Sequence, residues 1–207
     1  MIRTGHARTL ALLGIVGVVL GSGVIWTSVQ LRRATAARDP LSLLPILGEV
    51  PEFELTERSG QEFDLAELRG HIWVADFIFT YCAGPCPRMT ATMARLQKAT
   101  AHLPDVRLVS FSVDPERDTP EVMSAYADRY GADPSRWFFL TGPMETITHL
   151  AVHGFKVGSI EDPILHSTRF ILVDETGAIR AYRDSAEPDV VARLVRDIET
   201  LNEQRHP

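Results

Sequence analysis

The chain has 207 residues, of which 45% are hydrophobic and 23% charged, a balance that is typical of a folded domain and excludes disorder over the whole length. Residues 1–39 carry five arginines and one aspartate, a balance of +4, whereas residues 40–207 carry 16 basic and 26 acidic residues, a balance of −10. Such an acidic domain does not bind nucleic acid by neutralising phosphates, and two cysteines are too few for a disulfide-rich framework.

The N-terminal segment contains an uncharged run of 20 residues, Leu10 to Val29, which is long enough to cross a hydrocarbon core of about 30 Å. Arginines flank the run on both sides, and the short leader in front of it favours a cytoplasmic N-terminus. We therefore expect a cytoplasmic leader (1–9), a single transmembrane anchor (10–29), a linker (30–50) and a domain (51–207). We expect that domain on the periplasmic or extracytoplasmic side of the inner membrane.

A cleaved signal peptide is the alternative for this segment. Residues 34–36 read Ala-Thr-Ala, which resembles a small-residue cleavage site. However, the apolar run is longer than the usual h-region of about 7–15 residues, and Arg32 and Arg33 follow it, so an uncleaved anchor is favoured. Gly17 and Gly21 form a Gly-x-x-x-Gly pair that offers a route to a homodimer, although glycine is frequent in spanning helices.

The rest of the chain alternates segments with the patterns of strands and helices. Such alternation predicts an α/β sheet with helices on its faces, to which a final hairpin adds an antiparallel edge. The expected elements are a hairpin (53–56 and 62–65), a buried strand (72–79), a helix (87–100), a strand (106–113), a helix (119–130), a short strand (137–140), a helix (144–153), a second hairpin (169–173 and 179–182) and a closing helix (189–202).

The two cysteines lie where the buried strand ends and the next helix begins. Loops at the carboxyl ends of such strands are where open α/β sheets hold their ligands. Because Pro87 suits the first helical position, the sequence predicts Cys86 as the N-cap, where the helix end and Arg88 favour a thiolate. Cys82 comes four residues earlier, on a turn with a Gly-Pro pair. Two thiols so placed can close a disulfide or share one metal ion.

A soft-metal site at this loop needs a third ligand, and the candidates are the histidines. His166 precedes the predicted strand 169–173, and a loop that leads into a central strand can meet the cysteine turn. His149 and His153 are four residues apart on a predicted helix, which is a metal-ligand spacing. Their segment reads HLAVH and lacks the glutamate of a zinc protease, so a ligand role for this pair is the less favoured interpretation.

Acidic residues follow the second buried strand. Asp114 comes directly after it, on the side where the site is expected, whereas Glu116 and Asp118 fit a turn that leads into a helix cap. Met89 and Met93 lie on the apolar stripe of the predicted helix, so core packing is favoured over a role as thioether ligands.

Three segments in this order, FTYCAGPCPRM, SVDPERDTPE and HSTRFILVDETG, resemble the SCO/SenC family, and the resemblance covers about residues 50–203 together with the anchor. It implies a thioredoxin-like fold, a membrane tether, copper as the bound ion and a role in assembling the copper centre of cytochrome c oxidase. On this resemblance Cys82, Cys86 and His166 fall on the family's copper ligands, and Asp114 falls in its acidic loop. Arg88 and Asp114 are then expected beside the ligands or facing a partner.

The chemistry of these residues agrees with that expectation. Thiolates select copper(I), imidazole accepts copper readily, and a three-coordinate site stays open to a ligand from a partner. The expected partner is the copper-bearing subunit of the oxidase or another copper carrier, and we expect a carrier without catalytic residues rather than an enzyme. The copper(I) and copper(II) states both remain open.

A thiol-disulfide oxidoreductase that keeps the cysteines of a copper-receiving partner reduced is the alternative, with Cys82 and Cys86 as its redox pair. In its favour, Ala-Gly-Pro-Cys resembles the Gly-Pro-Cys of thioredoxins. Against it, three residues separate the cysteines instead of two, and residues 166–169 lack the cis-proline of that fold. A peroxiredoxin-like peroxidase is a weaker third hypothesis, because Pro-x-x-x-Thr-x-x-Cys does not occur.

Overall fold

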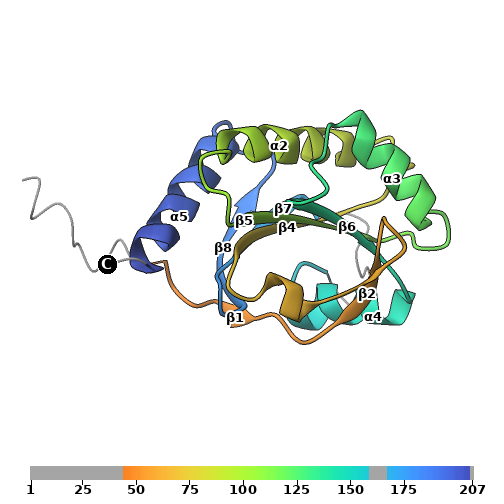
Figure 1. Cartoon of the computed structure of the whole chain (residues 1–207), viewed down its shortest axis with the longest axis horizontal. Coiled ribbons are helices and arrows are strands. Elements are labelled where there is room, and N and C mark those ends of the chain that lie inside the picture. The colour runs from red at the N-terminus through yellow and green to blue at the C-terminus, as the bar shows by residue number, and fades with distance from the viewer. Residues whose placement is uncertain (1–43, 159–166, 206–207) are drawn as a thin grey trace, which may run out of the picture. The chain divides into compact units, whose positions relative to one another are not determined.

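The computed structural model describes residues 44–158 and 167–205, and within these ranges eight strands form one mixed sheet (Figure 1). The strands lie in the order β1-β8-β7-β4-β5-β6-β2-β3. Their bounds are β1 (Gly48–Glu49), β2 (Glu54–Glu57), β3 (Glu62–Asp64), β4 (Ile72–Ile78), β5 (Val106–Ser112), β6 (Trp137–Thr141), β7 (Arg169–Val173) and β8 (Ala178–Asp184).

Helices cover both faces of the sheet (Figure 1). One face carries α2 (Cys86–Ala99), α3 (Pro120–Arg129) and α5 (Val190–Arg205), whose apolar residues share one core with the sheet. The other face carries the 3-10 helix η3 (Leu65–Leu68), α4 (Met144–His149) and the π-helix η4 (Leu150–Gly154), which share a second core. The sheet therefore separates α2 from α4 and η4.

The strand β4 lies at the centre of the sheet, and all seven of its residues are buried. A continuous apolar run of this kind suits a strand that is covered on both faces. β4 pairs in parallel with β5, and β5 pairs in parallel with β6, whereas β7 runs antiparallel to β4. The carboxyl ends of β4 and β5 thus lie together, and Val113 N donates to Ile78 O across 2.8 Å. The loops that follow these two strands start side by side.

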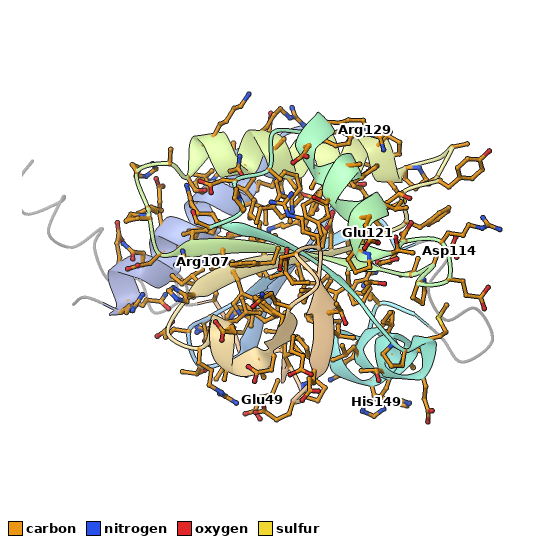
Figure 2. The ribbon with its side chains drawn as sticks, turned by 45° about the vertical axis from the view of Figure 1, so that its right-hand side comes forward. Glu49, Arg107, Asp114, Glu121, Arg129 and His149 are labelled. Carbon is orange, nitrogen blue, oxygen red and sulfur yellow. The ribbon has the colours of Figure 1, made fainter. Side chains whose placement is uncertain are left out.

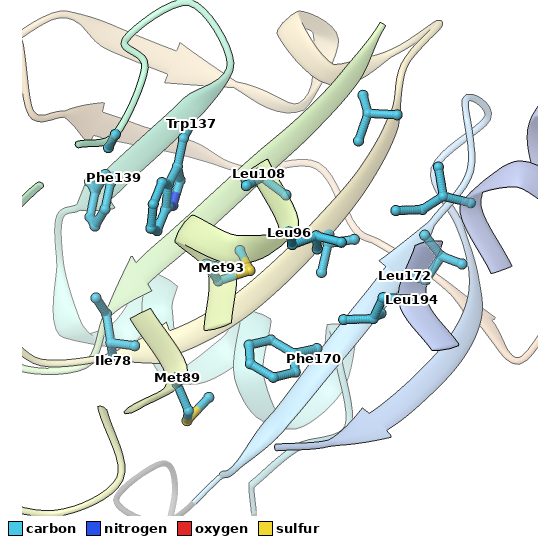
Figure 3. Close-up of a cluster of buried hydrophobic side chains, with 14 of the residues drawn as sticks. Ile78, Met89, Met93, Leu96, Leu108, Trp137, Phe139, Phe170, Leu172 and Leu194 are labelled. Atoms are coloured by element: carbon cyan, nitrogen blue, oxygen red, sulfur yellow. The ribbon is translucent and has the colours of Figure 1, made fainter. Parts of the chain in front are cut away.

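The face under α2 is closed by an apolar core (Figure 3). Met89, Met93 and Leu96 are fully buried at 0% exposure, and they lie on one side of α2 at helical spacing. Figure 3 shows Met89 and Met93 among side chains of the sheet and of α5, including Ile78 and Phe170. The prediction that the two methionines pack in the core is confirmed.

The predicted α/β architecture is confirmed, including both hairpins and the helices that follow the cysteines. The last residues of the segment expected to be a linker join the sheet, because Gly48 pairs with Ile179 and Glu49 pairs with Ala178. The expected leader, the anchor and the first part of the linker fall on residues 1–43, outside the described residues. Within the described ranges, no helix has both the length and the apolar character that crossing a membrane requires.

Candidate metal centre

Cys82 and Cys86 lie at the carboxyl end of the central strand, between β4 and α2. Both are free thiols, of which Cys86 is buried and Cys82 is half-buried. The loop folds back on itself, because Cys82 N donates to Phe79 O (3.3 Å) and Gly84 N donates to Cys82 Sγ (3.3 Å). One sulfur therefore faces the core and the other lies within reach of a partner molecule.

The protonation of Cys86 differs from the expectation. α2 begins at Cys86 and Pro85 occupies the N-cap, so Cys86 is the first helical residue rather than the cap. Burial is the largest effect and raises the pKa of Cys86 to about 12, while a hydrogen bond with the backbone of Phe79 acts in the opposite direction. The neighbouring Cys82 thiol raises this pKa further. The prediction that Cys86 is the N-cap is therefore wrong, and its burial acts against the thiolate that a helix start favours.

The carboxylate of Asp118, which we expected to support only a turn, is buried and holds the start of the cysteine loop in place. Asp118 has 0% exposure. Thr80 donates to it from its backbone N (3.1 Å) and from Oγ1 (2.5 Å), and Ser112 Oγ donates across 2.6 Å. Asp118 thereby ties the loop after β4 to the loop after β5. The sequence around Asp118 could not reveal this link between the two loops, because its hydrogen-bond partners lie up to 38 residues away.

A second buried carboxylate lies within β4 itself. Asp76 has 0% exposure, its Oδ1 accepts a hydrogen bond from Ser110 Oγ (2.6 Å), and its Oδ2 has no partner within the described residues. Burial raises the pKa of Asp76 to about 7, and the Ser110 hydrogen bond acts in the opposite direction. The charge of Asp76 also raises the pKa of Cys86 slightly, as the smallest of several causes. The signal in the sequence was one aspartate inside an otherwise apolar strand.

Asp114 and Arg88 lie on two elements next to the cysteine loop. Asp114, labelled in Figure 2, lies two residues after the end of β5 and is half-buried, and its Oδ2 lies 3.4 Å from Arg117 Nη1. Arg88 is exposed in the first turn of α2 and lines a groove between α2 and α5 together with Arg95 and Arg196. Within the part of the chain that the structure describes, neither residue belongs to a group of ligands that could hold a metal ion.

His166 lies outside the described residues. Among the residues that are described, no group of three or more His, Cys, Asp or Glu side chains is arranged to hold a metal ion. The pairing of β4 with β7 nevertheless indicates where the chain that follows His166 joins the sheet. Trp73 pairs with Val173, and Ala75 pairs with Ile171. β7 runs antiparallel to β4, so β7 begins at the end of the sheet where β4 ends. The chain therefore enters β7 at the end of β4 from which the cysteine loop leaves.

The SCO1/SenC family model matches residues 48–202. A relative described as a SCO1 protein homolog from Bacillus subtilis is 35% identical over 171 residues, which cover 80% of this chain and 86% of the relative. The structure of BsSco, reported with a disulfide switch in a member of the Sco family of cytochrome c oxidase assembly proteins, is 36% identical with a TM-score of 0.67. That match covers 76% of this chain and 95% of BsSco.

The structure of yeast Sco1 with copper bound is 22% identical, covers 75% of this chain and 94% of the yeast chain, and has a TM-score of 0.59, so it supports the fold. The thioredoxin-like α/β fold that the resemblance implied is confirmed by these structures. The family match spans both cysteines and the segment around His166. Its extent and the identity to the Bacillus subtilis relative lead to one conclusion: the chain belongs to the SCO1/SenC family.

Proposed function

We propose that this protein is a membrane-tethered copper carrier that binds copper through Cys82, Cys86 and His166 and assists assembly of the copper centre of cytochrome c oxidase. The observation that carries the proposal is the pair of free thiols at the end of the central strand, in a chain of the SCO1/SenC family. The copper held by yeast Sco1 and the assembly role stated for BsSco support it.

The donor set fits copper. Sulfur ligands are soft and select copper(I), and an imidazole completes three-coordination without closing the site. The burial of Cys86 excludes water from one side of the loop, while the half-buried Cys82 leaves the other side open to a ligand from a partner. A site with one buried and one accessible sulfur suits an ion that must be kept and then handed over. Copper is therefore the cargo of the site rather than a resident catalyst.

The register of β7 supports His166 as the third ligand. His166 precedes Arg169 by three residues, a length of chain that spans at most about 10 Å. Because β7 runs antiparallel to β4, Arg169 at the start of β7 lies toward the end of β4 from which the cysteine loop leaves. This shared end of the two strands supports His166 as a partner of the two thiols.

We further propose a membrane anchor and a surface that faces the partner. Residues 10–29 would anchor the protein in the inner membrane with the domain outside the cytoplasm, and Gly17 and Gly21 would bring two anchors together. Asp114 and the exposed Arg88 would face the partner, which is the copper-bearing subunit of the oxidase or another copper carrier.

Replacing His166 by alanine tests the copper site. We expect His166→Ala to weaken copper(I) binding by at least about tenfold, because loss of a group that merely orients a ligand already costs about that much. The measurement is a competition titration of the reduced full-length chain against a copper(I) chelator. His102→Ala is the control, because His102 is an exposed histidine whose Nε2 lies 3.6 Å from Glu199 Oε1 on α5. Unchanged copper(I) binding by His166→Ala would show that the assigned site is wrong.

A thiol-disulfide reductase is the second candidate, and the disulfide switch of BsSco favours it. Exchange needs an attacking thiolate and a resolving thiol, and no imidazole is required. The rate at which the reduced chain reduces a model disulfide therefore separates the two functions. A carrier keeps this rate in His166→Ala while it loses copper, whereas loss of exchange would identify His166 as a catalytic base.

A further inference from the structure

Two histidines lie together on the face of the sheet opposite α2. The ring centroids of His149 and His153 are 5.1 Å apart, and the two ring planes are inclined by 43°. Both side chains are exposed. Figure 2 shows His149 on the outer side of α4, pointing away from the sheet. The pair is therefore open to solvent and is not part of the core.

The backbone brings the two rings into line. A step of four residues is slightly more than one turn of an α-helix, which takes about 3.6 residues, and slightly less than one turn of the wider π-helix. His149 is the last residue of α4 and His153 lies within η4, so the chain between them runs through both kinds of helix. The excess over one α turn and the shortfall from one π turn oppose each other, which keeps the two side chains on the same side of the segment. The π turn is held by Phe155 N, which donates to Leu150 O across 2.7 Å.

Packing explains why the wider turn persists. Phe155 has 0% exposure and contacts the ring of Trp73 edge-on, with centroids 5.9 Å apart. Gly154 permits close approach of another segment, because a Cβ there would lie 2.7 Å from Pro51 Cδ. The alignment of the two histidines is thus maintained by the core. Single π turns of this kind are found frequently at functional sites.

The spacing of the rings fits a shared metal ion. With metal–nitrogen bonds of about 2.0–2.1 Å and a ring nitrogen about 1.1 Å from its centroid, two imidazoles have centroids about 5 Å apart on a tetrahedral ion and about 4.5 Å apart in neighbouring positions of a square-planar copper(II) ion. The observed separation is 5.1 Å. Exposed side chains can turn a nitrogen toward the common position without disturbing the core.

We propose that His149 and His153 form a second metal site, which binds one divalent cation and prefers copper(II). Imidazole suits copper, nickel and zinc ions, and copper(II) is bound most tightly of the divalent first-row ions. Water or a ligand from another molecule completes the coordination, since no third His, Cys, Asp or Glu joins the pair among the described residues. Because the chain supplies only these two ligands among the described residues, the site exchanges its ion readily.

This site is distinct from the cysteine loop. His149 and His153 belong to the helical segment that packs on one core, whereas Cys86 and α2 belong to the core on the other side of the sheet. One ion cannot bridge the two. The imidazole pair favours copper(II) and the thiols favour copper(I), so the two faces would select different oxidation states of one element.

The test uses the full-length chain with Cys82→Ser and Cys86→Ser, so that its result does not depend on the function proposed for the thiols. Copper(II) is titrated in competition with a chelator and followed by electron paramagnetic resonance. We expect one equivalent with nitrogen hyperfine coupling, and at least about tenfold weaker binding after His149→Ala or His153→Ala. His102→Ala is the matched control and should keep that affinity. Equal affinity in all of these variants would overturn the proposal.

A second measurement covers the case in which the cysteine-free chain does not fold. Wild-type protein is treated with diethyl pyrocarbonate with and without nickel(II), and each histidine is followed by peptide mass spectrometry. We expect nickel(II) to protect His149 and His153 from modification and to leave His102 reactive. Modification of all three histidines at unchanged rates would contradict the site even if the thiols bind nickel.

Discussion

Asp118 receives hydrogen bonds from two residues that precede it by six and 38 positions. Asp118→Asn puts an NH2 donor where a carboxylate oxygen accepts, so at least one of the hydrogen bonds from Thr80 and Ser112 must be reversed or lost. We expect this substitution to lower the free energy of unfolding by about 1–3 kcal/mol, measured with urea. Copper(I) affinity should fall as well, since Thr80 begins the cysteine loop.

The neighbouring Glu116→Gln serves as the control, because Glu116 is exposed in the same turn. It should change neither stability nor copper(I) affinity. If Asp118→Asn destabilised the chain and left copper(I) affinity intact, the carboxylate would support the fold without positioning the thiols.

Asp76 makes stability depend on pH. Its pKa is about 7 in the folded protein against an ordinary value of 3.8, so between these values the folded chain holds a proton that the unfolded chain has released. Stability must therefore fall as the pH rises through this window. We expect Asp76→Asn to be more stable than wild type at pH 8, on the order of 2–4 kcal/mol, and equally stable near pH 4.

Thermal or urea unfolding at several pH values measures this difference. Asp128→Asn is the control, because it removes an exposed carboxylate on α3 and should leave the pH dependence unchanged. Parallel pH profiles for wild type and Asp76→Asn would show that Asp76 ionises at the same pH in the folded and the unfolded chain, which would contradict a pKa raised by burial.

The residues of the site could be predicted from the sequence only where the signal is local. Cys82 and Cys86 stand out through their spacing and their place between a strand and a helix. The protonation of Cys86 could not be predicted, because it depends on how deeply the side chain is buried. Asp118 could not be identified either, since its role arises from pairing with Thr80 in three dimensions.

The helix α2 connects the candidate metal centre to the core. Met93 has 0% exposure, so Met93→Ala should lower the free energy of unfolding by about 2–5 kcal/mol through the cavity that it leaves. Met93→Leu keeps the volume and should cost less than about 1.5 kcal/mol. Because the sulfur packs in the core, Met93→Leu should bind copper(I) as wild type does. A large loss of affinity in that variant would instead identify Met93 as a ligand.

Elements with a strong local pattern could be predicted, and elements set by distant pairing could not. The apolar run of β4 and the Thr119 cap of α3 are of the first kind; the Thr119 side chain accepts a hydrogen bond from Val122 N, as the Thr-Pro pair predicts. The two residues of β1 are of the second kind, because their strand character comes from β8, about 130 positions later. The π turn of η4 likewise depends on how Phe155 fits the core.

At the scale of the whole molecule, the expected topology can be tested directly. Leu10 to Val29 is a single long apolar run, so alkaline phosphatase fused after residue 207 should be active in a bacterial host. The full-length protein should fractionate with membranes and resist extraction by high salt. Recovery of the domain in the soluble fraction, shortened at its N-terminus, would contradict the anchor and support a cleaved signal peptide.

The two outermost strands of the sheet are also its shortest. β1 has two residues and β3 has three, whereas β8, which β1 covers, has seven. A long free strand presents a row of unpaired N–H and C=O groups on which another chain can build. The backbone carbonyl of Leu44 accepts hydrogen bonds from Arg180 and so fastens the start of this segment to β8. Residues 44–49 thus cover the start of β8, and we expect a domain trimmed at residue 50 to expose that end of the strand to pairing with its own copies.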